Sequence, residues 1–369
     1  MGASNNLDAK TEMHEDVKKL LLEMVENNAS DLHLKSGYAP IFRINGELEH
    51  TKYAKHSSED IKRLCYSFIT SDQQQKFENE WELDFAIEVE NAARYRINLY
   101  RQRGSIGAAV RMLPLKIPAI SECGLPEDII IEKLLSKKKG LILVTGPTGS
   151  GKSTSLAAML NWINQNKGNH IMTVEDPIEY VFESKRSIIN QREISVDTHN
   201  FTNALKHVLR EDPDVILIGE MRDIETIEAA LNIAETGHLA FATLHTPDAV
   251  QSINRIVDVF PSYKQDQVRV QLSFVLLAVL TQQLLPNKQG DGRVLAHELM
   301  LANHAVRSLV RDKKGHQLYS VMQTGQSEGM STMNQSLADS YLGGHISYEQ
   351  AMFSSMDIED LKKLIERSV

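Results

Sequence analysis

The chain has 369 residues, 42% of them hydrophobic, and a net charge of −9 at neutral pH. This length predicts about two domains, and the hydrophobic content is sufficient for packed cores. The excess of acidic residues disfavours a primary role on nucleic acid, so we expect no nucleic-acid partner. The hydrophobic run 274–280 is far shorter than the ~20 residues that a membrane span needs, so we expect no transmembrane segment.

Two features of the chain indicate its compartment. Residues 1–12 are polar and lack the hydrophobic region of a signal peptide, and we expect them to form a disordered extension, either native or added. The cysteines are Cys65 and Cys123 only, which excludes a four-cysteine zinc site and indicates a reducing environment. We therefore expect a cytoplasmic protein.

Residues 13–111 predict a small α+β domain. Hydrophobic residues recur at helical spacing over 14–26, which predicts a first helix. Pro114 and Pro118 break regular structure, so we interpret residues 112–126 as an interdomain linker. Hydrophobic and polar residues alternate, as in half-buried strands, over 31–35, 85–89 and 95–99.

Residues 127–334 predict an α/β domain. Short hydrophobic segments alternate with helical stretches, which is typical of a parallel sheet with helices on both faces. Ligands bind such sheets at the carboxyl ends of the strands. Residues 335–369 are predicted to form C-terminal helices outside that core. The predicted strands are 141–145, 170–174, 214–218 and 239–244.

The first of these strands leads directly into a complete phosphate-binding loop. Its glycines let backbone N–H groups curl around an anion, and the helix that follows adds the positive end of its dipole. Lys152 can reach the β- and γ-phosphates of a nucleotide, and the Ser153 hydroxyl can ligate Mg²⁺. The sequence therefore predicts nucleotide binding. The loop consists of Gly146, Pro147, Thr148, Gly149, Ser150, Gly151, Lys152, Ser153 and Thr154.

Acidic residues follow two further strands of the predicted sheet. Three carboxylates lie within 175–179, and a carboxylate near the γ-phosphate can orient and deprotonate the attacking water. The strand 214–218 ends in Gly219 and Glu220, a variant of the Walker B pattern in which Glu220 can hold a metal-bound water or polarise the nucleophile. The alternative for both segments is a solvated acidic strand end.

Two histidines lie in segment 237–246, which contains the last predicted strand. His238 and His245 are seven positions apart, so a single strand would place them on opposite faces, and a zinc site is disfavoured. Each is a candidate γ-phosphate sensor or interface residue. The alternative is a hydrogen-bonded structural histidine.

Arginines gather in the first domain. They could form only a solvated sheet face. The alternative is that they add positive charge to a P-loop site, because such sites often use an arginine, sometimes from a neighbouring subunit, to stabilise the negative charge of the transition state. The first-domain arginines are Arg94, Arg96, Arg101, Arg103 and Arg111, and the second candidates are Arg192, Arg210 and Arg222.

The order of these motifs resembles that of the secretion ATPases of the type II/type IV pilus superfamily, over residues 14–350. In that family the phosphate-binding loop is followed by an Asp box, here 175–179, a Walker B segment, here 214–220, and a His box, here 237–245. More narrowly, segment 304–312 resembles a helix of the type IV pilus retraction ATPases. It departs from that helix at Val306, Ser308, Val310 and Asp312.

The resemblance implies a fold and a set of site residues. It implies a PAS-like N-terminal domain, a RecA-like ATPase domain and a homohexameric ring that binds ATP and Mg²⁺ between the two domains of each chain. The implied residues are Lys152 and Ser153 for phosphate and Mg²⁺, Glu179 as general base, Glu220 at the metal, His238 and His245 in the His box, and Arg96, Arg103 and Arg111 as arginines that close over the phosphates.

The resemblance also implies pilus retraction and twitching motility. ATP hydrolysis would rotate the domains and turn an inner-membrane pilus platform protein, with the ring peripheral to the inner membrane at the pilus base. An accessory retraction ATPase is a possible partner of this protein. The closest alternative is that this chain is itself such an accessory ATPase. Further alternatives are an assembly or secretion ATPase of a related system, a nucleotide-regulated scaffold without turnover, and, least favoured by charge, a RecA-like nucleic-acid motor.

Overall fold

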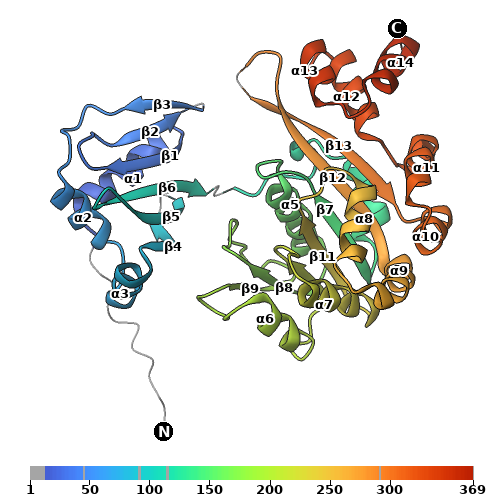
Figure 1. Ribbon diagram of the computed structural model, residues 1–369, viewed down its shortest axis with the longest axis horizontal. Coiled ribbons are helices and arrows are strands. Elements are labelled where there is room, and N and C mark those ends of the chain that lie inside the picture. Colours follow the sequence, from blue (N-terminus) through green and yellow to red (C-terminus); the bar gives the residue numbers. More distant parts are fainter. Residues whose placement is uncertain (1–12, 45, 90–92, 114–115, 291, 369) are drawn as a thin grey trace. The chain divides into compact units, whose positions relative to one another are not determined.

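The computed structural model describes residues 13–44, 46–89, 93–113, 116–290 and 292–368 (Figure 1). The chain divides into two compact units, which we call unit 1 (residues 1–116) and unit 2 (residues 117–369). The predicted extension at residues 1–12 lies outside the described residues, as do residues 114 and 115 of the predicted linker. The first two residues of that linker belong to a strand of unit 1, and residues 117–126 belong to unit 2.

The described residues of unit 1 form an antiparallel six-stranded sheet with helices packed against it. The elements are α1 (Glu15–Glu26), β1 (Ala29–Lys35), β2 (Ile41–Ile44), β3 (Glu47–His50), α2 (Ser58–Tyr66), α3 (Ser71–Glu80), β4 (Glu82–Val89), β5 (Ala93–Gln102) and β6 (Ser105–Leu113). The strand order is β3-β2-β1-β6-β5-β4. Leu21 of α1 and Leu64 of α2 share one hydrophobic core with Leu32 and Ile97 of the sheet, so the helices and the sheet form the small α+β domain that the sequence predicts.

The described residues of unit 2 form a seven-stranded sheet in the order β13-β12-β7-β11-β10-β8-β9. The strands are β7 (Gly140–Thr145), β8 (His170–Glu175), β9 (Ile188–Glu193), β10 (Val215–Ile218), β11 (Leu239–Leu244), β12 (Leu276–Pro286) and β13 (Arg293–Leu301). All neighbouring pairs are parallel except β12 and β13. The predicted α/β fold is confirmed, but the sheet is mixed rather than parallel, because the hairpin β12–β13 adds an antiparallel edge strand.

Helices lie on both faces of this sheet. Crossovers between parallel strands are right-handed in nearly all proteins, so the one from β7 to β8 carries α5 over one face and the connections that return toward β12 carry α6 to α9 over the other. Consistent with this arrangement, α7 contacts both α6 and α9. The helices are α4 (Glu127–Ile129), a π-helix (Ile130–Leu135), α5 (Lys152–Asn166), α6 (Phe201–Val208), α7 (Ile224–Glu235), α8 (Ala249–Asp258), α9 (Ser262–Val275), α10 (His304–Arg311), α11 (Leu318–Thr324), α12 (Met333–Leu342), α13 (Tyr348–Ser354) and α14 (Ile358–Ser368).

The last three helices have a small core of their own. Leu337 of α12, Ala351 of α13 and Leu361 of α14 pack with Leu285 and Ala296 of the hairpin β12–β13. This C-terminal group therefore rests on the edge of the sheet (Figure 1). Among the helices that the structure describes, none is both long enough and hydrophobic enough to cross a membrane.

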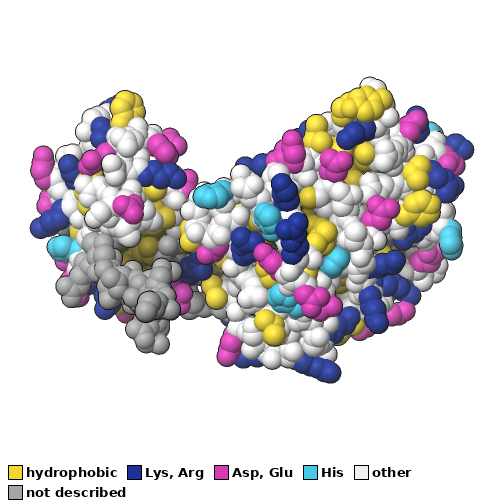
Figure 2. Space-filling model, turned by 90° about the horizontal axis from the view of Figure 1, so that it is seen from below, with side chains coloured by type: hydrophobic (Ala, Val, Ile, Leu, Met, Phe, Trp, Pro, Cys, Tyr) yellow, Lys and Arg dark blue, Asp and Glu magenta, His cyan; other side chains and the backbone are white. Residues whose placement is uncertain are grey.

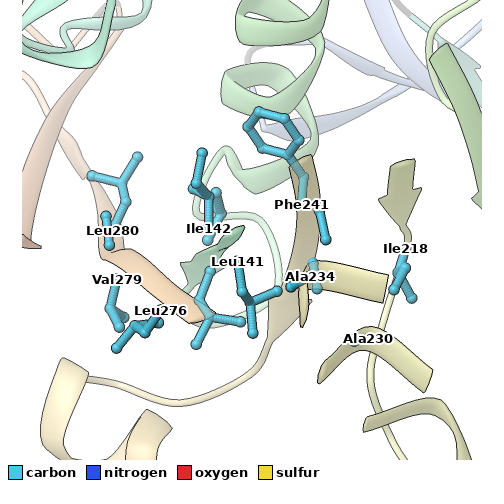
Figure 3. Packing of buried hydrophobic residues seen from close by; sticks show 14 of the residues in the cluster. Leu141, Ile142, Ile218, Ala230, Ala234, Phe241, Leu276, Val279 and Leu280 are labelled. Atoms are coloured by element: carbon cyan, nitrogen blue, oxygen red, sulfur yellow. The ribbon is translucent and has the colours of Figure 1, made fainter. Parts of the chain in front are cut away.

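The centre of unit 2 is a continuous hydrophobic core. Strands β7, β10 and β11 are buried along their whole lengths, which explains why their sequences are unbroken hydrophobic runs rather than alternating patterns. Phe241 of β11 is fully buried in this core. Figure 3 shows it with Leu141 and Ile142 of β7, Ile218 of β10, Ala230 and Ala234 of α7, and Leu276, Val279 and Leu280 of β12.

We expect Phe241→Ala to lower the free energy of unfolding of unit 2 by about 3–5 kcal/mol, because it removes a fully buried ring and leaves a cavity. Phe353→Ala is the matched control. That ring is 89% exposed, so its loss should change the stability by less than about 0.5 kcal/mol. Urea unfolding of both variants measures the difference, and equal effects would contradict the described core.

Candidate active site

Parallel strands bring the predicted motifs to one edge of the sheet of unit 2. Strands β7, β11, β10 and β8 are neighbours and run in the same direction, so their carboxyl ends meet. The loop 146–151 leaves this edge after β7, and the acidic segment 175–179 leaves it after β8. Glu220 follows β10, and His245 follows β11. Motifs far apart in the sequence therefore lie at one place.

The loop between β7 and α5 has the geometry of an anion site. Gly146 and Gly149 have positive φ angles of 134° and 79°, and such turns direct successive backbone N–H groups into one concavity. The hydroxyl of Ser150 is buried and has no hydrogen-bond partner among the described residues. Helix α5 begins at Lys152 and adds the positive end of its dipole. These features fit phosphate groups.

Lys152 is tied to the loop and lies beside a histidine. Its Nζ donates to the carbonyl oxygens of Gly146 at 2.8 Å and Pro147 at 2.9 Å, and lies 3.5 Å from Nδ1 of His245. Burial lowers the pKa of Lys152, while the negative charges of Glu220 and Glu179 act to raise it. The ammonium group is thus held where phosphate oxygens could replace the carbonyl oxygens.

Glu220 connects the loops after β10 and β11. Its carboxylate accepts a hydrogen bond from Nη2 of Arg222 at 2.7 Å and lies 3.3 Å from Nε2 of His245. Burial acts to raise the pKa of Glu220, but the hydrogen bond and charge of Arg222 and the neighbouring His245 together lower it. The carboxylate therefore stays ionised beside Lys152, as a metal ligand or a carboxylate that polarises water must.

The acidic segment after β8 carries two different kinds of glutamate. Glu175 accepts hydrogen bonds from Thr173 at 2.6 Å and from Gln191 at 3.3 Å, and burial raises its pKa to about 7. Glu179 is partly exposed and acts electrostatically on Lys152. The neighbour Tyr180 is buried, and its hydroxyl lies 3.0 Å from Oγ1 of Thr154. Of the two, Glu179 is the one whose charge acts on Lys152 at the loop.

The structure does not bring the two histidines together. Strand β11 begins at Leu239 and ends at Leu244, so His238 and His245 flank it at opposite ends rather than on opposite faces of one strand. Nδ1 of His238 lies 3.2 Å from Ile233 O and 3.2 Å from Thr236 Oγ1. Within unit 2, His238 therefore lies at the far end of the strand from Lys152, and an interface role for it stays a prediction.

Among the second-candidate arginines, one lies at the site. Arg222 pairs with Glu220, whereas Arg192 pairs with Glu211 at 3.1 Å and Arg210 is exposed after α6. The sequence did not show which of them would reach the acidic strand end.

The first-domain arginines have their own environments within unit 1. Strand register places Arg96 directly opposite Arg111. Nε of Arg111 donates to Asp31 at 2.9 Å, and Nε of Arg96 lies 4.0 Å from Asp84. Arg103 is exposed in the turn between β5 and β6, with φ of 45°. That these arginines close over phosphates stays a prediction.

A cavity of about 860 Å³ adjoins the loop, and sequence reasoning missed it. Its walls include Gly151 and Thr154, Cys123 near the start of unit 2, and Gln282 of β12. Gln282 Oε1 and the hydroxyl of Ser331, which also lines the cavity, are buried without hydrogen-bond partners among the described residues. The volume suits an organic group attached to a phosphate held in the loop. Residues this far apart in the chain left no local sequence signal.

Comparisons with known proteins place this geometry in a family. The family described as "Type II/IV secretion system protein" matches residues 6–352. The chain is 46% identical to the "Type IV pilus retractation ATPase PilT" of Pseudomonas aeruginosa, over 91% of this chain and 97% of that protein. It is 38% identical to the "Type IV pilus ATPase PilU" of the same organism, over 95% of this chain and 91% of that protein.

A solved structure has the same fold. The structure described as the pilus retraction motor PilT with bound ADP is 49% identical, with a TM-score of 0.87 over 94% of this chain and 98% of that one. The resemblance that the motifs indicate is thus confirmed over nearly the whole chain.

We expect Gly146→Ala to destabilise unit 2 more than Gly149→Ala. Both glycines have positive φ, which costs a side-chain-bearing residue about 1–2 kcal/mol. A Cβ atom at position 146 would also lie 2.3 Å from the carbonyl oxygen of Gln282, whereas one at position 149 would meet nothing within 4 Å. Thermal unfolding without nucleotide compares the two variants. Equal losses of stability would show that β12 does not confine the loop.

Glu175 should make the stability depend on pH. Its folded-state pKa of about 7 lies above the ordinary value of 4.5, so its contribution to stability is present at low pH and is lost as pH rises from about 4.5 to about 7. Glu175→Gln resembles the protonated carboxyl and keeps two hydrogen-bonding atoms. We expect it to raise the melting temperature by several degrees at about pH 8 and by much less at about pH 5. An equal change at both pH values would refute the burial of this carboxylate.

Proposed function

Because the chain belongs to the family of type II/IV secretion system proteins, we propose that it is a P-loop ATPase that powers type IV pilus retraction and twitching motility. The observation that carries the proposal is the convergence of Lys152, Glu179, Glu220 and His245 on the loop after β7. Its support in the comparisons is the 46% identity to a protein named as a retraction ATPase.

The site supplies each part that phosphoryl transfer to water needs. The loop N–H groups and Lys152 hold the β- and γ-phosphates of ATP. Ser153 and Glu220 would hold Mg²⁺, which supplies charge stabilisation to the transferring phosphoryl group. Glu179 takes a proton from the attacking water as its oxygen bonds to the γ-phosphorus and the bond to the β,γ-bridging oxygen breaks. His245, which lies beside both Lys152 and Glu220, suits a sensor of the γ-phosphate.

The cavity beside the loop takes the base and ribose of the nucleotide. Thr154, next to Ser153 at the start of α5, lies on the cavity wall. The adenosine part can therefore extend from the phosphates into this space.

We propose that the motor is a homohexamer at the cytoplasmic face of the inner membrane, where it turns the pilus platform protein. ATP closes the two domains of a chain, and Arg96, Arg103 and Arg111 then approach the phosphates and add positive charge. Arg96 and Arg111 suit this role because they lie side by side on one sheet face. His238, remote from Lys152 within unit 2, suits a contact with a neighbouring subunit.

Two observations weigh against the rival functions. The identity to the protein named PilU, 38%, is lower than the identity to the protein named PilT, 46%, over similar spans. On the face in Figure 2, Lys and Arg side chains lie among Asp and Glu side chains, and the net charge is −9. A nucleic-acid motor would present a continuous basic surface.

In a deletion strain, excess pili with lost twitching would support retraction, and loss of pili would support assembly.

The proposed roles predict how turnover depends on three residues. Lys152→Ala should abolish ATP hydrolysis, and Glu179→Gln and Glu220→Gln should each lower kcat by about 10²–10⁴-fold, because a general base or a metal-site carboxylate is lost. Lys138→Ala, at an exposed lysine, is the control and should leave kcat unchanged. Phosphate release is measured together with light scattering in Mg²⁺ and ATP. ATP binding without turnover in the wild type would favour the scaffold, and turnover that persists in both glutamine variants would refute the assigned roles.

A further inference from the structure

The segment that carries Glu179 has no regular structure of its own. Residues 176–182 connect the end of β8 to the residues before β9 without a helix or strand. A general base must be held within hydrogen-bond reach of its water, so a segment of this kind needs other contacts to fix it.

Gln191 of β9 supplies the main contacts to this segment. Its Oε1 accepts a hydrogen bond from the N–H of Phe182 at 2.9 Å, and its Nε2 donates to the carbonyl oxygen of Tyr180 at 2.8 Å. The same Nε2 also donates to Glu175 Oε1 at 3.3 Å. The side chain of Gln191 thus joins the end of β8 to both sides of residue 181.

The pattern of these bonds explains why the residue is a glutamine. In an extended chain, the C=O of one residue and the N–H of the second residue after it point to the same side. The amide of Gln191 pairs with Tyr180 O and Phe182 N–H as one residue of a neighbouring strand would. A primary amide presents a donor and an acceptor in one plane without depending on pH. A glutamate cannot donate when ionised, and an asparagine is one methylene shorter.

Two further contacts complete the anchoring. Glu193, also on β9, accepts a hydrogen bond from the N–H of Ile178 at 3.2 Å. The hydroxyl of Tyr180 lies 3.0 Å from Thr154 in the helix after the phosphate-binding loop. Both neighbours of Glu179 are therefore fixed, and Ile178 and Tyr180 are buried while Glu179 between them is partly exposed.

We propose that Gln191 is a positioning residue for catalysis, which holds the segment 176–182 so that Glu179 is directed at the attacking water. The proposal rests on the function proposed above. It gives the edge strand β9 a role in the reaction, although no atom of Gln191 needs to touch the nucleotide.

The first test separates positioning from nucleotide binding. Gln191→Met keeps the length of the side chain and removes all three hydrogen bonds. We expect kcat for ATP hydrolysis to fall by about 10–100-fold, while KM for ATP and Kd for ADP change by less than about threefold, because the contacts of Lys152 are untouched. Asn190→Leu is the matched control. It removes an amide from the same strand, but that amide bonds His170 at 2.8 Å and does not contact the segment.

The second test needs no turnover. Hydrogen exchange of the Phe182 amide in Gln191→Met should be about tenfold faster than in the wild type and in Asn190→Leu, because the amide loses its acceptor. Faster exchange with wild-type kcat would overturn the proposal, as would a fall in kcat with unchanged exchange. If the wild type itself does not hydrolyse ATP, the proposed function fails, and the exchange rates alone then decide whether Gln191 holds the segment.

A third variant gives a signature that general destabilisation would not. Gln191→Glu places a carboxyl beside Glu175, with Glu179 and Glu193 also acting on that site. Only the protonated form of the new carboxyl can donate to Tyr180 O. We therefore expect the ratio of its kcat to that of the wild type to increase as pH falls from about 8.5 to about 6.5. A ratio that is constant over this range would overturn the proposal.

Discussion

The whole site depends on the parallel pairing of β7, β11, β10 and β8 in unit 2. Parallel neighbours end at the same edge of the sheet, so the loops that follow them lie close together. The contacts at this edge are then short. His245, after β11, contacts both Lys152, after β7, and Glu220, after β10. Tyr180, after β8, contacts Thr154, so the fourth segment is connected to the same place. A shift in register of one strand would separate these groups.

A second level of support comes from β12, on the far side of β7. The hydroxyls of Thr145 and Thr281 lie 2.9 Å apart, and Gln282 Nε2 donates to Ser155 Oγ at 2.6 Å. The backbone of Gln282 passes so close to Gly146 that no Cβ fits between them. The phosphate-binding loop is therefore confined by β12 on one side and, through Tyr180, by the acidic segment on the other. The hairpin β12–β13, which confines the phosphate-binding loop, also packs against the C-terminal helices.

Local patterns made the central motifs predictable, and long-range pairing hid the rest. The loop 146–154 and Glu220 each follow a buried hydrophobic strand directly, so a short stretch of sequence shows both the element and its end. The pairing of β12 with β7 and the cavity beside Gln282 each join segments over a hundred positions apart. Gln191 was not among the site candidates, because two of its partners are backbone groups of Tyr180 and Phe182, which no sequence pattern reveals. His238 was placed on the same strand as His245, and only the strand boundaries show that the two are at opposite ends.

The proposed mechanism depends most on Glu179, held beside the phosphate-binding loop, as the base that activates water. A structure of the Glu220→Gln protein with ATP and Mg²⁺ tests it most directly, since this variant should retain ATP. We expect a carboxylate oxygen of Glu179 within about 2.6–3.2 Å of a water in line with the γ-phosphate, or linked to that water through one further water. A structure in which Glu179 points away and another side chain contacts that water would contradict it.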